Sequence, residues 1–479
     1  MALQRGSGAS GTGNPLNIPD ATPDGNLYGR KDNAWVEANA ADTTVADAGG
    51  LLAATNVETA LAELATDADN HLADTTGAHA ASAIAFTPAG TVAATDVQTA
   101  INELDTEKAP LASPTFTGTP AAPTAAASTD TTQIATTAFV QDVVAAVVTG
   151  KNALINGDFA VAQRGTSFTS ATTPANSDDT YLLDRWTLLS DGNDVVDVTQ
   201  STTVPTAPGA LTSIALDVET VNKKFGIIQF IEQKNCNGLI GATCTLSFKM
   251  KVSATTKLDN IKAAIIAWDG TADTVTSDVV SAWNAEDTNP TLVANWTYEN
   301  TPVNLVPTTS FATYSVSAAV DTASAKNIAV MIWSDVTDTT LGDFVYITDV
   351  QFEVGAAATS FERLSFDRVV EKCERYFEKT YDLATAPGTV TDAGKIRHSD
   401  PISGGQFYNQ FSVRKRATPT VVLYSPATGA SANYRDETSA LDIAASATFV
   451  GERGFNHACG SHGAADETVA WHYTAVAEL

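Results

Sequence analysis

The chain has 479 residues, of which 27 are lysine or arginine and 55 are aspartate or glutamate, so its formal net charge is −28. This length exceeds what one hydrophobic core organises and predicts about three or four domains. The charge disfavours nucleic-acid binding, the lack of any run of eighteen apolar residues disfavours membrane insertion, and the four cysteines form no disulfide or zinc pattern and are expected to be small buried residues.

Residues 1–38 begin with a tail rich in Gly, Ser and Thr that lacks the apolar region of a signal peptide, so we expect no export by that route. Two turn signals follow, PDG at 23–25 and DN at 32–33. Tyr28 and Trp35 stand on either side of the second signal, which predicts a small hairpin. A hairpin that anchors the chain and one that only caps the next segment are both compatible with this pattern.

Residues 39–108 contain an internal repeat, in which LAATNVETALAEL from Leu52 matches VAATDVQTAINEL from Val92 at an offset of 40. Each copy carries a capping box, begun by Thr55 or Thr95, which predicts that a helix begins there. The apolar residues then recur at i, i+4 and i+7, a narrow stripe suited to a seam between chains. These seam candidates are Val57, Leu61, Leu64, Val97, Ile101 and Leu104.

Residues 109–150 change character halfway. Four prolines between 110 and 123 exclude a helix interior and predict extended chain. After Thr132, apolar residues at three- and four-residue spacing predict one short helix that ends at Gly150. Neither half can bury a core alone, so we add Val140, Val143, Val144 and Val147 to the predicted seam.

The sequence SPTFTGTPAAPT followed by QIATTAFV closely resembles the linker that recurs in bacteriophage tail fibres and related receptor-binding proteins, which are homotrimers. Two further stretches, HLADTTGAHAASAIAFTPAG and DGNLYGRKDNAWVE, resemble segments of phage fibres and structural proteins. The resemblance implies an attachment segment at 1–38 and a trimeric stalk of short coiled coils and extended linkers at 39–150.

Residues 151–363 are short β-rich runs between Gly, Asn, Asp and Pro clusters, which predicts an antiparallel β-sandwich. NGDF with QRG near the start, DRW at 184–186 and ITDVQFEVG near the end resemble a jelly-roll domain of phage tail proteins that is similar to carbohydrate-binding modules. Such modules often hold a structural calcium ion, and Asp158 and Asp349 are the matching acids. Ala160 departs from that pattern, because a carboxylate is expected there.

Five of the seven tryptophans lie in this sandwich. Trp186 and Trp333 stand within apolar runs, so we expect them in the core. Trp283, Trp296 and Tyr298 lie in a polar stretch, where aromatic faces beside Asn and Asp side chains suit a sugar ring. Aromatic residues that pin a long loop explain these three equally well.

Residues 364–479 begin with a helix that resembles one following the sandwich in phage proteins, and its predicted buried face comprises Val369, Cys373, Tyr376 and Phe377. Strands are expected over 406–413, 418–426, 445–455 and 467–479, with turns at Asn409, Gly429, Gly454 and Gly460. The candidate exposed aromatic residues are Tyr408, Tyr424, Tyr434, Trp471, His472 and Tyr473. Strand alternation places Trp471 and Tyr473 on one face and His472 on the other, and leaves open which face is core.

Catalytic signatures are weak in this chain. It has no GxSxG or HExxH motif and no long β-helix repeat, and the best acid pair, Glu286 with Asp287, consists of neighbours on one loop. We therefore predict an adhesive structural protein without enzymatic activity, and a glycan depolymerase is the less favoured reading.

The predicted protein is a mainly β, homotrimeric tail fibre of the virion, assembled in the host cytoplasm and held by a tail or baseplate protein through residues 1–38. Its expected receptor is a host surface polysaccharide or lipopolysaccharide. The C-terminal tip is the preferred contact, because it lies farthest from such an anchor and is nearly balanced in charge, with 11 basic and 14 acidic residues from Ser365 onward. A head or baseplate fibre with a decorative or weakly adhesive role is the alternative.

Overall fold

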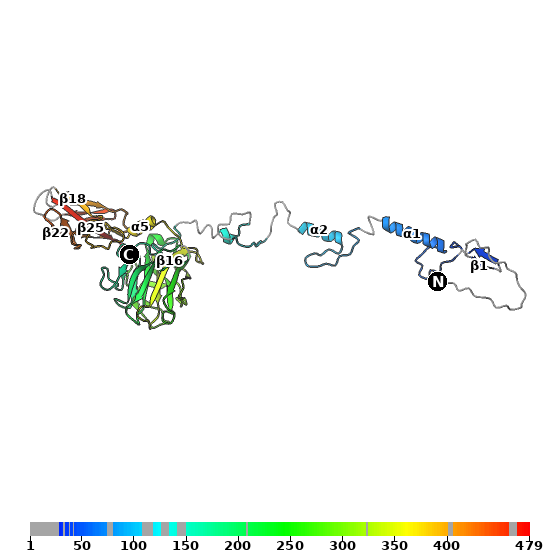
Figure 1. The fold of residues 1–479 in the computed structure, drawn as a ribbon, viewed down its shortest axis with the longest axis horizontal. Coiled ribbons are helices and arrows are strands. Elements are labelled where there is room, and N and C mark those ends of the chain that lie inside the picture. The colour runs from blue at the N-terminus through cyan, green and yellow to red at the C-terminus, as the bar shows by residue number, and fades with distance from the viewer. Residues whose placement is uncertain are drawn as a thin grey trace. The chain divides into compact units, whose positions relative to one another are not determined.

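The computed structural model describes residues 28–31, 34–37, 39–41, 43–73, 80–107, 118–125, 134–140, 150–206, 209–321, 324–400, 406–458 and 467–479. The chain divides into two compact units, residues 1–121 and residues 122–479 (Figure 1). No helix among the described residues is long and apolar enough to cross a membrane.

The first unit opens with the predicted hairpin. Strand β1 (Tyr28–Lys31) pairs antiparallel with β2 (Ala34–Glu37), and Lys31 lies opposite Ala34. The turn signal at 32–33 therefore marked the hairpin correctly.

Both copies of the repeat form the predicted helices, α1 (Val57–Ala73) and α2 (Val97–Glu107), but the capping residues differ from those expected. Asn56 Oδ1 accepts the Thr59 backbone N–H at 2.8 Å, and Asp96 Oδ1 accepts that of Thr99 at 2.9 Å. The short Asn and Asp side chains reach the first-turn amides, so each helix begins two residues after the predicted threonine.

The chain before each helix folds back onto it in the same way. The Glu63 carboxylate accepts the backbone N–H groups of Ala53 and Ala54, and the Glu103 carboxylate accepts those of Ala93 and Ala94, all at 2.8–2.9 Å. The two sequence repeats are therefore two copies of one structural unit.

The predicted seam is exposed in the single chain. Leu61, Leu64, Ile101 and Leu104 are 43–61% exposed, and the only buried residues of the two helices are Ala60 and Ala100. Of the remaining seam residues, Val57 and Val97 are half-buried and Val140 is exposed, while Val143, Val144 and Val147 lie outside the described residues. The structure contains one chain, so the trimeric seam stays a prediction.

The linker fits its predicted character where it is described. Residues 118–125 contain neither helix nor strand, and residues 137–140 are helical after Thr136, whose Oγ1 accepts the Phe139 backbone N–H at 3.1 Å. The rest of the predicted 134–148 helix and the first prolines lie outside the described residues.

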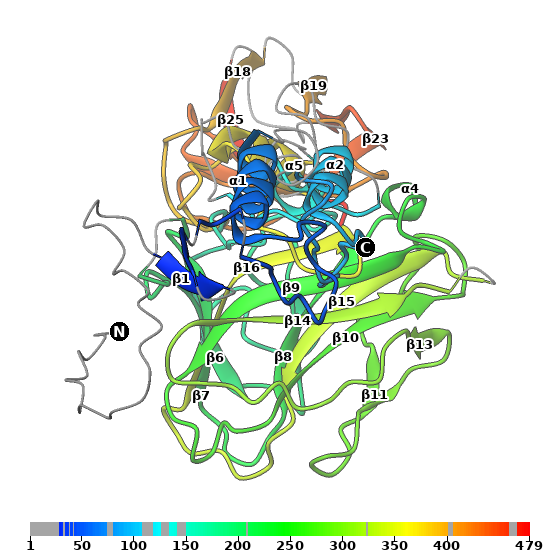
Figure 2. The ribbon, with the colours of Figure 1, turned by 90° about the vertical axis from the view of Figure 1, so that its right-hand side faces the viewer.

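The second unit contains the predicted antiparallel sandwich (Figure 2). Its first sheet has the order β13-β10-β15-β8-β5-β4, with β4 (Thr180–Tyr181), β5 (Thr187–Ser190), β8 (Phe225–Ile231), β10 (Ile261–Trp268), β13 (Trp296–Tyr298) and β15 (Asn327–Ser334). The second sheet has the order β14-β9-β16-β7-β6-β3, with β3 (Ser167–Phe168), β6 (Val196–Ser201), β7 (Ser213–Val218), β9 (Thr243–Val252), β14 (Ala312–Ala319) and β16 (Phe344–Val354).

The first sheet is buried on both faces. Its inner face packs against the second sheet in the main core, which includes Trp186, Ile265 and Phe248. Its outer face carries a second apolar layer, with Trp268, Trp296 and Trp333, beneath the segment that contains β11 (Val280–Ala282) and β12 (Thr291–Leu292). The expectation that Trp186 and Trp333 are core residues is confirmed.

The C-terminal region is built around one long strand, β25 (Glu467–Val476). Around it lie helix α5 (Phe366–Glu374) and strands β17 (Phe377–Lys379), β18 (Ile396–Asp400), β20 (Thr420–Tyr424), β21 (Asn433–Asp436) and β22 (Leu441–Ala444). Strands β17 and β20 both pair with β25 at Val476, and β18 and β21 both pair with it at Ala470, so β25 has a partner on each side. A second sheet, β19-β24-β23, comprises β19 (Gln406–Gln410), β24 (Gly454–Ala458) and β23 (Ala447–Gly451).

Several local predictions for this region differ from the structure. Helix α5 ends at Glu374, so Tyr376 and Phe377 follow it, although both are buried as predicted together with Val369 and Cys373. Asn409 lies inside β19, Gly454 begins β24 directly after the turn at 452–453, and Gly429 forms a turn, with φ of +74°. Gly460 and Cys459 lie outside the described residues, and the other three cysteines are free and buried as expected.

The sandwich and the C-terminal region are joined by buried polar contacts. Gln163 Nε2 donates to the Phe377 carbonyl at 2.9 Å, and the Lys379 ammonium donates to the Gln163 carbonyl at 2.5 Å. The last residue, Leu479, accepts the Tyr181 hydroxyl at 3.0 Å through its carbonyl. The two β regions therefore form one interlocked unit, with α5 at their junction (Figure 1).

Candidate functional site

The aromatic loop of the sandwich is a packed segment. Trp296 is 5% exposed, and its ring centre lies 5.3 Å from that of Trp268 and 5.8 Å from that of Phe230. Trp283 is half-buried against the same apolar layer, and the Tyr298 hydroxyl donates to the Pro290 carbonyl at 2.9 Å. Of the two readings that the sequence allowed, the structure therefore favours aromatic residues that pin the loop.

The acid pair of this loop, Glu286 and Asp287, also holds the loop against the sandwich. Asp287 donates its backbone N–H to the buried Asp335 carboxylate at 2.8 Å and accepts the Asn260 amide at 2.8 Å. Glu286 accepts the Thr337 hydroxyl at 3.2 Å. Asp335 also pairs with the buried Lys224 and Lys262, at 2.5 and 2.8 Å.

Four of the candidate aromatic residues in the tip are buried, so the expectation that they are exposed is wrong for Tyr434, Trp471, His472 and Tyr473. The cause is the central place of β25, which is covered on both faces. On one face Trp471 packs 4.5 Å from the His457 ring, and on the other His472 stacks 3.9 Å from the Tyr381 ring.

Tyr408 is the predicted aromatic that remains open, with 61% of its surface exposed, while Tyr424 is half-buried. Tyr408 lies opposite Asn456 of β24, and Asn456 lies opposite Thr448 of β23, so these three side chains form one row across the sheet. Gln406 and Gln410, two residues before and after Tyr408, are on the same face and are exposed.

A glycine shapes this face. A methyl group at Gly454 would come 2.6 Å from the Tyr408 hydroxyl oxygen, so the outer end of the tyrosine ring lies over Gly454. Phe449, on β23 of the same sheet, is 80% exposed. We call the group Gln406, Tyr408, Gln410, Thr448 and Asn456 the Tyr408 face; it combines an open aromatic ring with amides and a hydroxyl.

Sequence reasoning missed a groove on the second sheet of the sandwich. Lys249, Lys251, Phe311 and Thr313 line a space of about 490 Å³. The Lys251 ammonium lies 5.4 Å from the Phe311 ring centre and 4.9 Å from that of Tyr346. The alternation of lysines at 249 and 251 around buried Met250 is the signal that could have found it.

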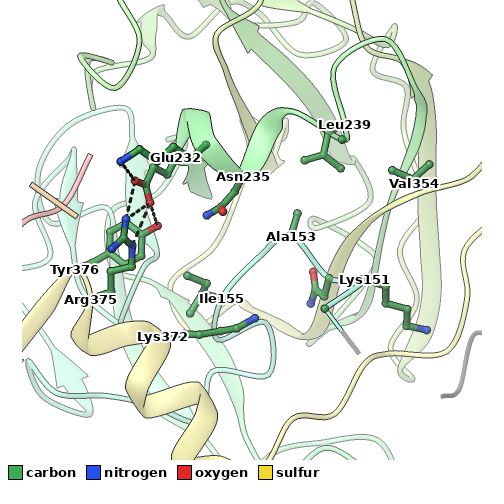
Figure 3. Close-up of a pocket in the computed structure, with 14 residues that line it drawn as sticks. Lys151, Ala153, Ile155, Glu232, Asn235, Leu239, Val354, Lys372, Arg375 and Tyr376 are labelled. Carbon is green, nitrogen blue, oxygen red and sulfur yellow. Dashed lines mark hydrogen bonds and ion pairs between the residues drawn. The ribbon is translucent and has the colours of Figure 1, made fainter. Parts of the chain in front are cut away.

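A larger pocket, about 600 Å³, lies at the junction of the sandwich and α5 (Figure 3). The Glu232 carboxylate at its side is 2% exposed and accepts two hydrogen bonds from Arg375 Nη2, at 2.8 and 3.0 Å, and one from the Tyr376 hydroxyl at 3.2 Å. We call this space the junction pocket. Sequence reasoning also missed it, since its residues come from segments up to about two hundred positions apart.

The two acids proposed for calcium do not fit a calcium site. Asp349 pairs with Arg363 at 2.7 Å and with Lys249 at 3.0 Å, and Asp158 lies 3.6 Å from Arg363. The Arg363 guanidinium therefore bridges the two carboxylates. Burial raises the pKa of Asp158, with Arg363 acting in the opposite direction, and no group of three metal-binding side chains occurs among the described residues.

The buried cysteines show no sign of reactivity. Burial raises the pKa of the Cys236 thiol to about 12 and that of Cys244 to about 11, and the same cause raises that of Cys373. A thiol with a raised pKa is a poor nucleophile at neutral pH.

No family model matches the sequence, and no curated protein matches it either. Similar solved structures include the enzymatically active domain of tailspike protein 4 from bacteriophage CBA120, at 19% identity and a TM-score of 0.25, over 43% of this chain and 22% of that one. A putative sugar-binding protein from Bacteroides thetaiotaomicron matches at 14% identity and a TM-score of 0.26, over 43% of this chain and all of that one.

A carbohydrate-binding module solved with β-1,4-galactotriose, TmCBM61, is also similar, at 12% identity and a TM-score of 0.22, over 36% of this chain and 88% of that one. The neighbours thus include carbohydrate-binding modules and one phage tailspike domain, which this chain matches over less than a quarter of its length.

Proposed function

We propose that this chain is an adhesive structural protein of a virion, a bacteriophage tail fibre that binds a glycan on the host surface without cleaving it. The Tyr408 face carries the proposal. An exposed aromatic ring offers its face to the C–H bonds of a sugar, and the neighbouring Gln406, Gln410 and Asn456 amides offer donors and acceptors to its hydroxyls.

The binding role, without catalysis, is supported by what the acid pair does. Glu286 and Asp287 hold a loop against the sandwich through Thr337, Asn260 and Asp335. A glycosidase needs two carboxyl groups on opposite sides of a sugar ring, roughly 5 to 10 Å apart. Two neighbouring carboxylates that are committed to hydrogen bonds within one loop do not suit that arrangement.

The homotrimeric stalk is supported by the open seam. Leu61, Leu64, Ile101 and Leu104 lie exposed on helices of 17 and 11 residues that bury little of their own surface. Helices this short are marginal in water by themselves, and parallel copies of the same stripe would cover the apolar residues. The linker sequence that resembles trimeric phage fibres points to three copies, with residues 1–38 joining a tail or baseplate protein.

The test is binding of the whole protein to a panel of bacterial surface polysaccharides and lipopolysaccharides. We expect Tyr408→Ala to weaken binding at least about tenfold, because stacking on an aromatic ring and its burial are both lost. Tyr408→Phe keeps the ring and should retain most of the binding. Phe366→Ala removes a comparably exposed aromatic on α5 and serves as the matched control. Full binding by Tyr408→Ala would refute the assignment.

A further inference from the structure

The junction pocket draws its walls from four parts of the second unit (Figure 3). The first two are the stretch 150–155 before the sandwich and the segment around α4 (Gln233–Cys236). The other two are Val354 at the end of β16, and Lys372 of α5 with Arg375 and Tyr376 just after that helix. A volume of about 600 Å³ lies within the range of small-ligand sites, which is roughly 300–1,000 Å³.

The pocket is positively charged although the chain is strongly acidic. Its lining includes the cations Lys151, Lys234, Lys372 and Arg375 and the single acid Glu232, a formal balance of four minus one, or +3. The chain as a whole carries −28. A concentration of cations in one concave site raises the local concentration of anions there.

The carboxylate in the pocket is already neutralised. Glu232 is buried and binds Arg375 and the Tyr376 hydroxyl, so these contacts fix the pocket wall and Arg375 balances the charge of the carboxylate. Lys234 lies 4.0 Å from Glu232, at the outer limit of an ion pair, and its side chain is 72% exposed.

The other two lysines have no acidic partner among the described residues. The Lys151 ammonium donates to the Thr359 hydroxyl and the Ser360 carbonyl, both at 2.7 Å and both neutral. The Lys372 ammonium makes no ion pair or hydrogen bond with the described residues. Figure 3 shows it directed toward the middle of the pocket. The nearby Glu362 carboxylate accepts the backbone N–H groups of Gly150 and of Asn152, the latter at 2.8 Å.

The positive lining continues beyond this space. An adjoining pocket of about 390 Å³ shares Gly150 and Lys372 and adds Arg363 and Arg368. Lys372 therefore borders both spaces, with cations on either side.

The remaining lining suits a sugar. Ala153, Ile155, Leu239 and Val354 supply apolar surface, and the exposed Asn235 amide supplies hydrogen-bonding groups. We propose that the junction pocket binds a saccharide unit that bears a carboxylate or a phosphate, with Lys372 and Lys234 contacting the anionic group. That the anion is a sugar rests on the proposed glycan-binding function; the site is separate from the Tyr408 face.

The experiment is calorimetric titration of the full-length protein with glucuronic acid, glucose 6-phosphate, glucose and inorganic phosphate. We expect glucuronic acid or glucose 6-phosphate to bind, which distinguishes a carboxylate from a phosphate, and glucose to bind at least tenfold more weakly. Lys372→Gln combined with Lys234→Gln should weaken anionic sugar binding about tenfold or more, because charge-assisted hydrogen bonds are lost. High salt should weaken the binding as well.

Lys257→Gln is the matched control, since Lys257 is a surface lysine paired with Asp338 on another part of the sandwich. Unchanged melting temperatures would show that the variants are folded. Equal binding of glucose and glucuronic acid, binding of inorganic phosphate alone, or no effect of the lysine substitutions would overturn the inference. Titration with the small anionic sugars reports on the junction pocket, and binding of whole polysaccharides by Tyr408→Ala reports on the Tyr408 face, so failure of either site gives a different result.

Discussion

Glu478, the second-last residue of the chain, forms an ion pair with Arg164 near the start of the sandwich, with 3.0 Å between Oε1 and Nη2. Its other carboxylate oxygen pairs with Arg185, whose guanidinium stacks 3.7 Å from the Tyr376 ring centre. One side chain from the end of the tip thus neutralises two buried arginines of the sandwich. Removal of residues 365–479 would leave Arg185 without its anion and Arg164 with Asp184 at 4.0 Å, so point variants are the better way to locate a receptor site.

We expect Glu478→Gln to lower the free energy of unfolding by about 3–5 kcal/mol, because it leaves the buried Arg185 without its anion. Chemical denaturation of the purified protein measures this. Asp338→Asn breaks an exposed ion pair with Lys257 and should have a much smaller effect on the free energy of unfolding, because solvent screens the two charges. Equal effects of the two substitutions would contradict a stabilising role for the buried ion pairs of Glu478.

The seam predicts a second result. Leu61→Glu with Ile101→Glu should convert the assembled stalk to monomers, because charges would replace the apolar contacts between copies. Size-exclusion chromatography with light scattering measures the mass. Ala62→Glu with Asn102→Glu places the same charges on the neighbouring exposed positions and should leave the oligomer intact. A wild-type monomer would refute the trimer directly.

Substitutions of Trp296 and Trp283 should change the stability of the sandwich without changing glycan binding. Trp296→Ala removes a buried ring packed against Trp268 and Phe230 and should cost about 3–5 kcal/mol of unfolding free energy. Trp283→Ala, at a half-buried position, should cost less. Trp283→Ala should also retain glycan binding, and a large loss of affinity with normal stability would move the receptor site to this loop.

Asp179 predicts a pH dependence. Burial, followed by the charges of Asp178 and Asp278, raises the pKa of Asp179 to about 7. Between its ordinary value near 4 and 7 the folded protein holds more protons at this group than the unfolded chain, so its contribution to stability falls as pH rises through that window. Asp179→Asn should therefore raise the melting temperature at pH 8 relative to wild type and change it little at pH 4. Asp259→Asn, at an exposed position, should change the melting temperature little at either pH.

His457, in the C-terminal region, should give a pH dependence of stability opposite to that of Asp179. Burial, with a smaller contribution from His398, lowers the pKa of His457 to about 4. The unfolded chain binds more protons between pH 6.5 and 4, so this group reduces stability as the pH falls through that range. We expect acid to lower the unfolding midpoint reported by tryptophan fluorescence, and His457→Gln to reduce that shift. His71→Gln, in exposed α1, should leave the shift unchanged.

The sequence by itself determined the elements with local causes. The hairpin at 28–37, the repeated helices α1 and α2, the antiparallel sandwich and the buried face of α5 follow from turn residues, capping and apolar spacing, which act over a few positions. Even there the cap moved from Thr55 to Asn56, because several polar residues in a row can reach the first-turn amides.

Only the tertiary structure decided which faces are open. Tyr408 and Trp471 both lie in strands with similar local patterns, yet Tyr408 faces outward on β19 while Trp471 is buried, because β25 is central and covered on both faces. The junction pocket likewise required Glu232 and Arg375, 143 positions apart, to meet. Burial and ion pairing depend on distant segments that fold against each other, and no local periodicity encodes that choice.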